Sequence, residues 1–236
     1  MRICIVNQSS IPDREVLQAI RVINAQLVDF AYHWSVVAQC RLEGSRGRTI
    51  TMRELRGDAL IYLQGKPQDG ALGWHDADSY GVPHGVVYTE SSSSGTGENW
   101  TVTLSHEVLE LLLDPHVNRL AAGPHPEDPQ RIVLHWYEAC DAVQASTYDI
   151  AGVPVSDFVL PAYFTPDEER GMRMTYLGAD IPSFGIAPGG YVGFYDPATG
   201  EHDAVFADSI GEAAYLAKHG RGRGQRYMNL VRKLAK

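Results

Sequence analysis

Cysteine is scarce in this chain of 236 residues, and no apolar run approaches the roughly 18 residues that a transmembrane helix needs. The three cysteines, Cys4, Cys40 and Cys140, are an odd number and form no Cys-x-x-Cys pair. These absences exclude a disulfide scaffold and indicate reduced thiols, so we expect a cytoplasmic protein with no membrane partner. The apolar stretch after Met1 is too short for the central region of a signal peptide and predicts a first strand instead.

Positive charge is in the minority, because 20 Lys and Arg face 29 Asp and Glu and give a net charge of −9. An acidic chain of this kind does not suggest a nucleic-acid groove. The exception is the segment from Lys218 to Lys236, which holds seven Lys or Arg and no acid. We interpret it as a solvated helix beside an acidic surface, with contact to an anionic partner as the alternative. Nucleic acid is therefore not an expected partner.

The length and composition fit a globular protein with a sizeable core. At 44% hydrophobic and 21% charged residues, the chain matches average soluble proteins, which excludes the disordered and fibrous classes. Residues 2–7, 35–42 and 58–64 predict strands, and apolar residues spaced four and three apart from Val16 to Phe30 predict a helix after the first of them. This order is typical of an α+β or mixed α/β fold with the helix on one face of a sheet.

The middle of the chain predicts a second helix. Residues 65–83 are rich in Gly, Asp and Pro and predict a loop, and Gly85–Glu90 predicts a short strand after it. The helix is expected from about Asn99, its cap, to Leu113, because Pro115 disfavours helical geometry in the residue before it.

We expect two lobes that meet at this helix. The N-terminal lobe, residues 1–114, ends with it, and the C-terminal lobe, residues 115–236, completes the functional site and ends in the basic helix. The elements expected in this C-terminal region are a strand at 132–137, hairpins at 148–158 and 191–206, and helices near 209–218 and 224–235.

The chemistry of the chain is concentrated in the run Ser105-His106-Glu107-Val108-Leu109-Glu110. Residues four apart share one face of a helix, so His106 and Glu110 can reach the same ion, with Glu107 one step round. A His-Glu-x-x-His helix binds zinc in this way, with the intervening Glu as general base. Here Glu110 replaces the second His, and a carboxylate oxygen is also a zinc ligand. The spacing therefore predicts a metal site.

The alternative interpretation is a polar stripe on the surface of an amphipathic helix. Two features favour the metal. The residues around the motif are apolar and leave little solvent face, namely Leu104, Val108, Leu109, Leu111, Leu112 and Leu113. Buried charges usually have a partner or a metal. In addition, two more acids, Glu138 and Asp141, lie close together in the sequence after a predicted strand.

These motifs resemble the zincin metallopeptidases. A short strand directly ahead of a His-Glu helix is similar to their arrangement, in which an antiparallel edge strand holds the extended substrate; we assign that strand to Gly85–Glu90. The run Ser105–Pro115 resembles a variant His-Glu-x-x-Glu-x-x-x-Asp-Pro block of bacterial zincin-like proteins and, more distantly, of the plant phosphate-induced (exordium-like) family. A later Glu-x-x-Asp segment of that group is matched by Glu138 and Asp141. The resemblance covers about residues 2–165 and implies a zincin-like sheet with an active-site helix.

Carried onto this sequence, the resemblance makes Glu107 the general base and gives the ion two helix ligands, His106 and Glu110. The third zincin ligand comes from downstream, and no His stands at the expected short spacing. We therefore expect Glu138, Asp141 or both to complete the coordination.

Several other polar residues are interpreted first as structural. Asp114 is the next choice as a ligand, because it lies two helical turns beyond the motif His. His75 is interpreted as a solvated loop residue, and His116 as a surface residue. Cys140 is interpreted as a core residue, since strand alternation would point it away from the acids on either side. Asp157 is interpreted as a turn residue or as a support for the site.

The resulting hypothesis is a metal-dependent hydrolase of the metallopeptidase type, acting on a peptide or protein substrate. The metal is expected to be about one zinc ion per chain, because one imidazole among carboxylates suits Zn²⁺, with manganese or iron as alternatives. A rival from another class is a non-catalytic, metal-stabilised binding protein with a closed ligand set of His106, Glu110, Glu138 and Asp141. A metal-free scaffold with hydrogen-bonded acids is the second rival.

Overall fold

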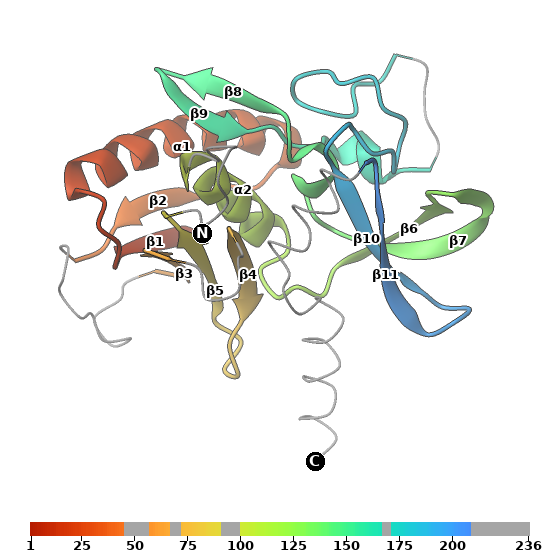
Figure 1. Ribbon diagram of the computed structural model, residues 1–236, viewed down its shortest axis with the longest axis horizontal. Helices are drawn as coiled ribbons and strands as arrows, with labels where there is room; N and C mark the ends of the chain where they lie inside the picture. The colour runs from red at the N-terminus through yellow and green to blue at the C-terminus, as the bar shows by residue number, and fades with distance from the viewer. Residues whose placement is uncertain (45–56, 67–71, 91–99, 167–170, 209–236) are drawn as a thin grey trace.

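The computed structural model describes residues 1–44, 57–66, 72–90, 100–166 and 171–208, which form a mixed α+β fold (Figure 1). A five-stranded sheet carries two helices, and a four-stranded sheet and a two-stranded hairpin accompany it. The expected α+β class is confirmed. Within the ranges just given, no helix combines the length and apolar character needed to cross a membrane.

The first sheet has the strand order β2-β1-β3-β5-β4. Its strands are β1 (Arg2–Asn7), β2 (Gln39–Leu42), β3 (Ala59–Gln64), β4 (Gly73–Ala77) and β5 (Pro83–Tyr88). All neighbours are parallel except β4, which runs antiparallel to β5 at the edge. The loop expected at 65–83 is therefore wrong in part, because β4 lies inside it. The strand expected at the edge, β5, lies instead between β3 and β4.

A tight connection allows β4 to pair with β5. The Oδ1 atom of Asp78 accepts hydrogen bonds from the backbone N–H groups of Tyr80 (2.8 Å) and Val82 (2.9 Å). Gly81 has a φ of 77°, a left-handed conformation that glycine adopts at little cost. The aspartate and the glycine thus form a turn that reverses the chain directly onto β5.

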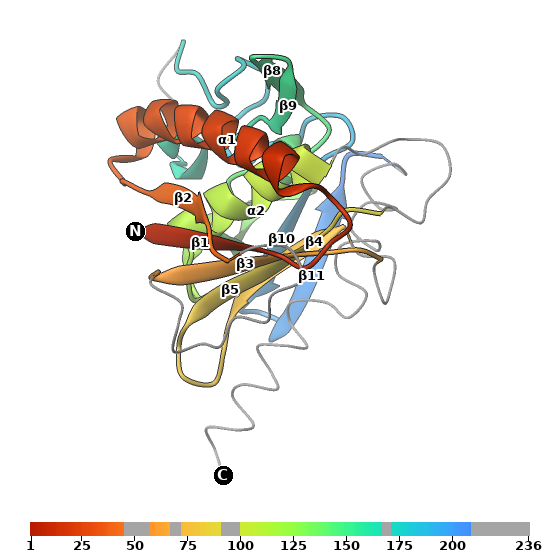
Figure 2. The same cartoon turned by 90° about the vertical axis from the view of Figure 1, so that its left-hand side faces the viewer.

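The two helices lie on the same side of this sheet (Figure 2). Helix α1 (Asp13–Trp34) packs over β2 and buries its predicted stripe of Val16, Ile20, Ile23, Leu27 and Phe30. Helix α2 (Trp100–Leu113) packs over β5 and β4. Every residue from Leu104 to Leu113 is buried, so the polar side chains of α2 do not form a solvated stripe.

The predicted hairpin at 148–158 fixes α2 in place. It consists of β8 (Thr147–Ile150) and β9 (Val153–Ser156). The backbone N–H of Ser156 donates to the hydroxyl of Ser105 on α2 at 2.8 Å, and the carbonyl of Ser156 accepts from the amide of Gln26 on α1 at 2.8 Å. All three side chains are fully buried, so one residue of β9 links both helices through buried hydrogen bonds.

The second sheet is antiparallel, with the order β11-β10-β7-β6. Its strands are β6 (Leu120–His125), β7 (Asp128–Trp136), β10 (Tyr191–Asp196) and β11 (Glu201–Phe206). The strand expected at 132–137 and the hairpin expected at 191–206 are confirmed, and β6 is a strand that was not expected. Two short 3-10 helices, η1 (Asp141–Val143) and η2 (Pro161–Phe164), lie between β7 and β10.

Some expectations fall outside the described residues: the cap at Asn99, the helices near 209–218 and 224–235, and the basic segment that they include. The division into lobes at residue 114 stays a prediction. The core that contains the apolar residues of α1 and α2 also contains Ala139, Cys140, Phe158 and Leu160 from beyond that point. The segment after β7 is thereby packed against α2, where the site lies.

Candidate metal centre

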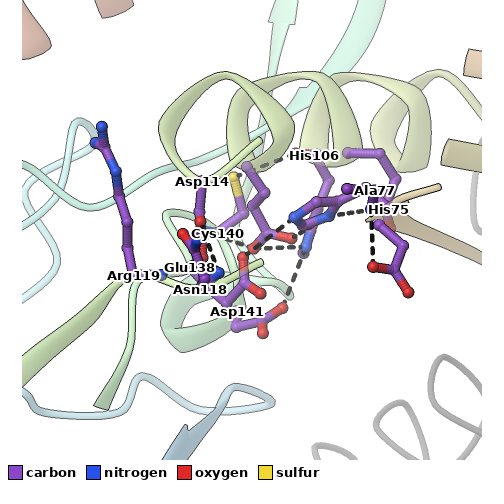
Figure 3. Close-up of polar contacts among 12 residues, drawn as sticks. His75, Ala77, His106, Asp114, Asn118, Arg119, Glu138, Cys140 and Asp141 are labelled. Atoms are coloured by element: carbon purple, nitrogen blue, oxygen red, sulfur yellow. Dashed lines mark hydrogen bonds and ion pairs between the residues drawn. The ribbon is translucent and has the colours of Figure 1, made fainter. Parts of the chain in front are cut away.

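Polar side chains from three parts of the chain, one of them α2, lie together in one cluster (Figure 3). Helix α2 supplies His106, Glu107 and Glu110; strand β4 supplies His75; and the segment after β7 supplies Glu138, Cys140 and Asp141. None of these seven residues is more than 8% exposed. The metal ligands expected from the sequence are therefore brought into one buried cluster, with two residues that the sequence did not assign to it.

On one side of the cluster, His106 contacts two of the expected ligands. Its Nε2 atom lies 3.0 Å from Oε1 of Glu110 and 3.2 Å from Oδ1 of Asp141. The same Oε1 atom accepts a hydrogen bond from the backbone N–H of Cys140 at 3.1 Å. The helical spacing of four thus places the imidazole and the carboxylate together, as predicted.

The thiol of Cys140 also faces this side of the cluster. Its Sγ atom lies within 4.8 Å of ligand atoms of His106 and Glu110. The expected strand alternation does not apply, because β7 ends at Trp136 and the chain turns into η1 just after Cys140. The thiol is fully buried, which agrees with its interpretation as a core residue, but it lies nearer to the ligands than the pattern suggested.

On the other side, His75 is a member of the cluster and not a solvated loop residue. Its Nδ1 atom lies 3.1 Å from Oε2 of Glu107 and 3.9 Å from Oε2 of Glu110, and its Nε2 atom lies 3.8 Å from Oε2 of Glu138. The interpretation from the sequence was wrong because β4 was not recognised. Gly73 and His75 are buried and the apolar Trp74 is only half-buried, so apolar alternation along the sequence does not mark the face of β4 that points into the cluster.

The side chain of Glu107 lies between its own helix, α2, and strand β4. It is fully buried, and a Cβ atom on Gly73 would come within 2.9 Å of its Oε1 atom. Glycine at position 73 is therefore needed for the strand to approach the helix this closely. The carboxylate of Glu107 therefore contacts the edge strand β4 at Gly73 and at His75.

Two other acids have structural roles. Asp114 accepts hydrogen bonds from the backbone N–H groups of Asn118 (3.0 Å) and Arg119 (3.1 Å), so both of its carboxylate oxygens hold the turn that leaves α2. Asp157 accepts from the backbone N–H groups of Phe158 and Leu177, and burial raises the pKa of its carboxyl group to about 6. The surface position expected for His116 is confirmed.

A small hollow of ≈ 10 Å³ adjoins the cluster and has room for about one water molecule. Its walls include Glu138 and Asp141 from the cluster, Tyr163 of η2, and Tyr191 and Gly193 of β10. It is the second sheet, therefore, that closes the cluster on this side.

The donors present fit a divalent metal ion. Imidazole and carboxylate are the ligand types that zinc takes together. The Nε2 atom of His75 is buried and has no hydrogen-bond partner among the residues that the structure describes. A buried nitrogen without a hydrogen bond destabilises the fold unless another group binds it, and a metal ion would bind it.

Near the cluster, His135 gives the fold a measurable pH dependence. Its Nε2–H donates to the carbonyl of Pro124 at 2.8 Å, and burial lowers the pKa of its imidazole to about 4. The unfolded chain therefore binds more protons than the folded chain between pH 4 and about 6.5, so the free energy of unfolding falls as the pH falls through this window.

At pH 4.5 we expect His135 to account for a loss of about 2–3 kcal/mol in unfolding free energy relative to pH 7. Urea unfolding of the native protein and of His135→Gln at both pH values would measure it, because glutamine keeps a donor for Pro124 but does not titrate in this range. The variant should lose less stability on acidification. Equal losses in the two proteins would contradict the assignment.

No protein-family model matches this chain, and no curated protein matches it either. A solved structure described as "Structure of a chaperone-substrate complex" is similar to it with a TM-score of 0.33 and 18% identity; the match covers 53% of this chain and only 26% of that one. A likeness this weak carries no argument, and a function has to follow from the geometry of the site.

Proposed function

We propose that this protein is a metal-dependent hydrolase of peptide or related amide bonds and that its metal is zinc. The observation that carries the proposal is the contact of His106 with Glu110 and Asp141, at 3.0 and 3.2 Å, inside a buried cluster. Ligand atoms that each lie about 2.0–2.2 Å from one zinc ion are at most about 4.3 Å apart, so both distances suit a shared ion. Manganese and iron accept the same donors.

When bound, the ion would act as a Lewis acid toward the scissile carbonyl and would ease deprotonation of a water molecule. Glu107 is the proposed proton carrier: it takes a proton from the attacking water and passes it to the leaving amine. Its place one step round the helix from His106 supports this role. Glu110 in the position of a second His adds negative charge, which lowers the electrophilic power of the site.

The arrangement of the first sheet supports a zincin-like enzyme. Strand β4 is antiparallel, lies at the edge and packs beside α2. An extended peptide can add to such an edge through main-chain hydrogen bonds. In this proposal β4, and not β5, aligns the substrate. Three buried cysteines that form no disulfide support a reducing, cytoplasmic setting.

A second candidate function is a metal-stabilised binding module. The burial of every donor favours it, because a structural zinc site has four protein ligands and no open position. His106, Glu110, Glu138 and Asp141 would supply that closed set.

The test is metal analysis of the purified chain combined with digestion of a broad peptide library at neutral pH. We expect bound zinc or another transition metal, and cleavage that a chelator abolishes. Cleavage that resists the chelator would indicate a contaminating protease. Absence of metal, together with no uptake of added zinc, would exclude the proposal. Full metal content with no cleavage would favour the binding module.

A further inference from the structure

We infer that the cluster holds a second divalent cation, bound by His75, Glu110 and Glu138, so that Glu110 bridges two ions. The inference rests on the proposed function in one respect, since it takes the ion beside His106 as the first. The second position would accept Zn²⁺ or Mn²⁺, because one imidazole with two carboxylates suits either.

The two oxygens of Glu110 face different imidazoles. Oε1 lies 3.0 Å from Nε2 of His106, while Oε2 lies 3.9 Å from the ring of His75, measured to Nδ1, the nitrogen that faces Glu107 and not the proposed ion. Ligand atoms of His75, Glu110 and Glu138 all lie within 4.8 Å of one another, and a separate group of the same size joins Glu110 to His106 and Cys140. A carboxylate shared by two such groups is the geometry of a two-metal centre, in which the ions lie about 3.5–4 Å apart.

The separation of His75 from Glu138 also points to an ion. Nε2 of His75 and Oε2 of Glu138 are 3.8 Å apart, which exceeds hydrogen-bond length but lies within the roughly 4.3 Å that two ligands of one zinc ion can span. Nε2 is buried and has no hydrogen-bond partner among the described residues. A cation between the two atoms would satisfy the nitrogen.

Glu107 leaves this nitrogen ready to bind. The Nδ1 atom of His75 lies 3.1 Å from Oε2 of Glu107, so an ionised Glu107 holds the imidazole proton on Nδ1. The lone pair is then on Nε2, on the side of Glu138. Carboxylate, imidazole and metal in this order are the usual way in which a protein orients a histidine ligand. Glu107 is therefore a positioning residue for the second ion as well as the proposed proton carrier.

The test counts ions in the full chain. Protein stripped with a chelator, reloaded with excess Zn²⁺ and desalted should contain two ions per chain by elemental analysis. His75→Ala should contain one, and His84→Ala, a half-buried histidine on the neighbouring strand β5, should keep two. Glu138→Gln is the second variant, because it should also lower the count to one if His75→Ala does not fold. In the native chain, two bound Mn²⁺ should give a spin-coupled electron paramagnetic resonance signal.

One ion per chain in the native protein would overturn the second position and leave the proposed hydrolase intact. Two ions in His75→Ala would also overturn it. No ion at all would exclude both this inference and the proposed function.

Discussion

Glu107→Gln is expected to lower turnover of a cleaved peptide by about 10²–10⁴-fold, the usual contribution of a positioned acid–base group. The metal content and the fold should stay unchanged, because glutamine has nearly the same shape and its carbonyl oxygen still accepts the hydrogen bond from Nδ1 of His75. Steady-state kinetics on a peptide selected from the library digestion, with elemental analysis of the same samples, would measure both effects.

The matched control is Glu127→Gln, the same substitution at an exposed glutamate between β6 and β7. It should cleave the peptide at the native rate. Full activity of Glu107→Gln would remove the proton carrier from the mechanism. Loss of metal together with activity would assign Glu107 mainly to the orientation of His75 and would separate that role from proton transfer.

The elements that could be predicted from the sequence are those with a long, regular pattern. The stripe of α1 from Val16 to Phe30 repeats over four turns, and α2 is bounded by a proline at position 115. The same regularity gave the positions of His106, Glu107 and Glu110 on one helix. Intervals of three and four along a helix depend only on local geometry, so no tertiary information was needed.

His75 could not be recognised because β4 depends on its partner. The strand has only five residues, its apolar content is low, and turn-forming residues surround it. Its conformation is fixed by the Asp78 turn and by pairing with β5, both of which are features of the folded chain. The direction of the Cys140 side chain was missed for a related reason: alternation was extended beyond Trp136, where the strand ends.

Convergence of the downstream acids on α2 also depends on tertiary contacts. Glu138 and Asp141 reach the helix because Ala139 and Cys140 between them pack in the core that contains α2. The backbone N–H of Cys140 donates to Glu110, which fixes the segment at the site. The sequence placed the two acids close to each other, but their distance from His106 follows only from this packing.

Replacing the helix ligands gives the largest expected effect on metal binding. Glu110→Ala should remove all bound metal, because its carboxylate faces both His106 and His75. His106→Ala should lose the ion beside Asp141, with a fall in affinity of more than about 100-fold, since even the residues that only orient ligands contribute about 10–100-fold. Calorimetric titration of the stripped variants with Zn²⁺ would measure these losses.

The controls are two of the histidines outside the cluster. His116→Ala removes an exposed imidazole, and His125→Ala removes one from β6 that accepts a hydrogen bond from the backbone N–H of Glu127. Both should keep the native metal content. Equal metal content in His106→Ala would move the site elsewhere in the chain. The side chain of His116 lies on the surface beyond the end of α2. Loss of metal in His116→Ala would therefore contradict a metal site built on α2.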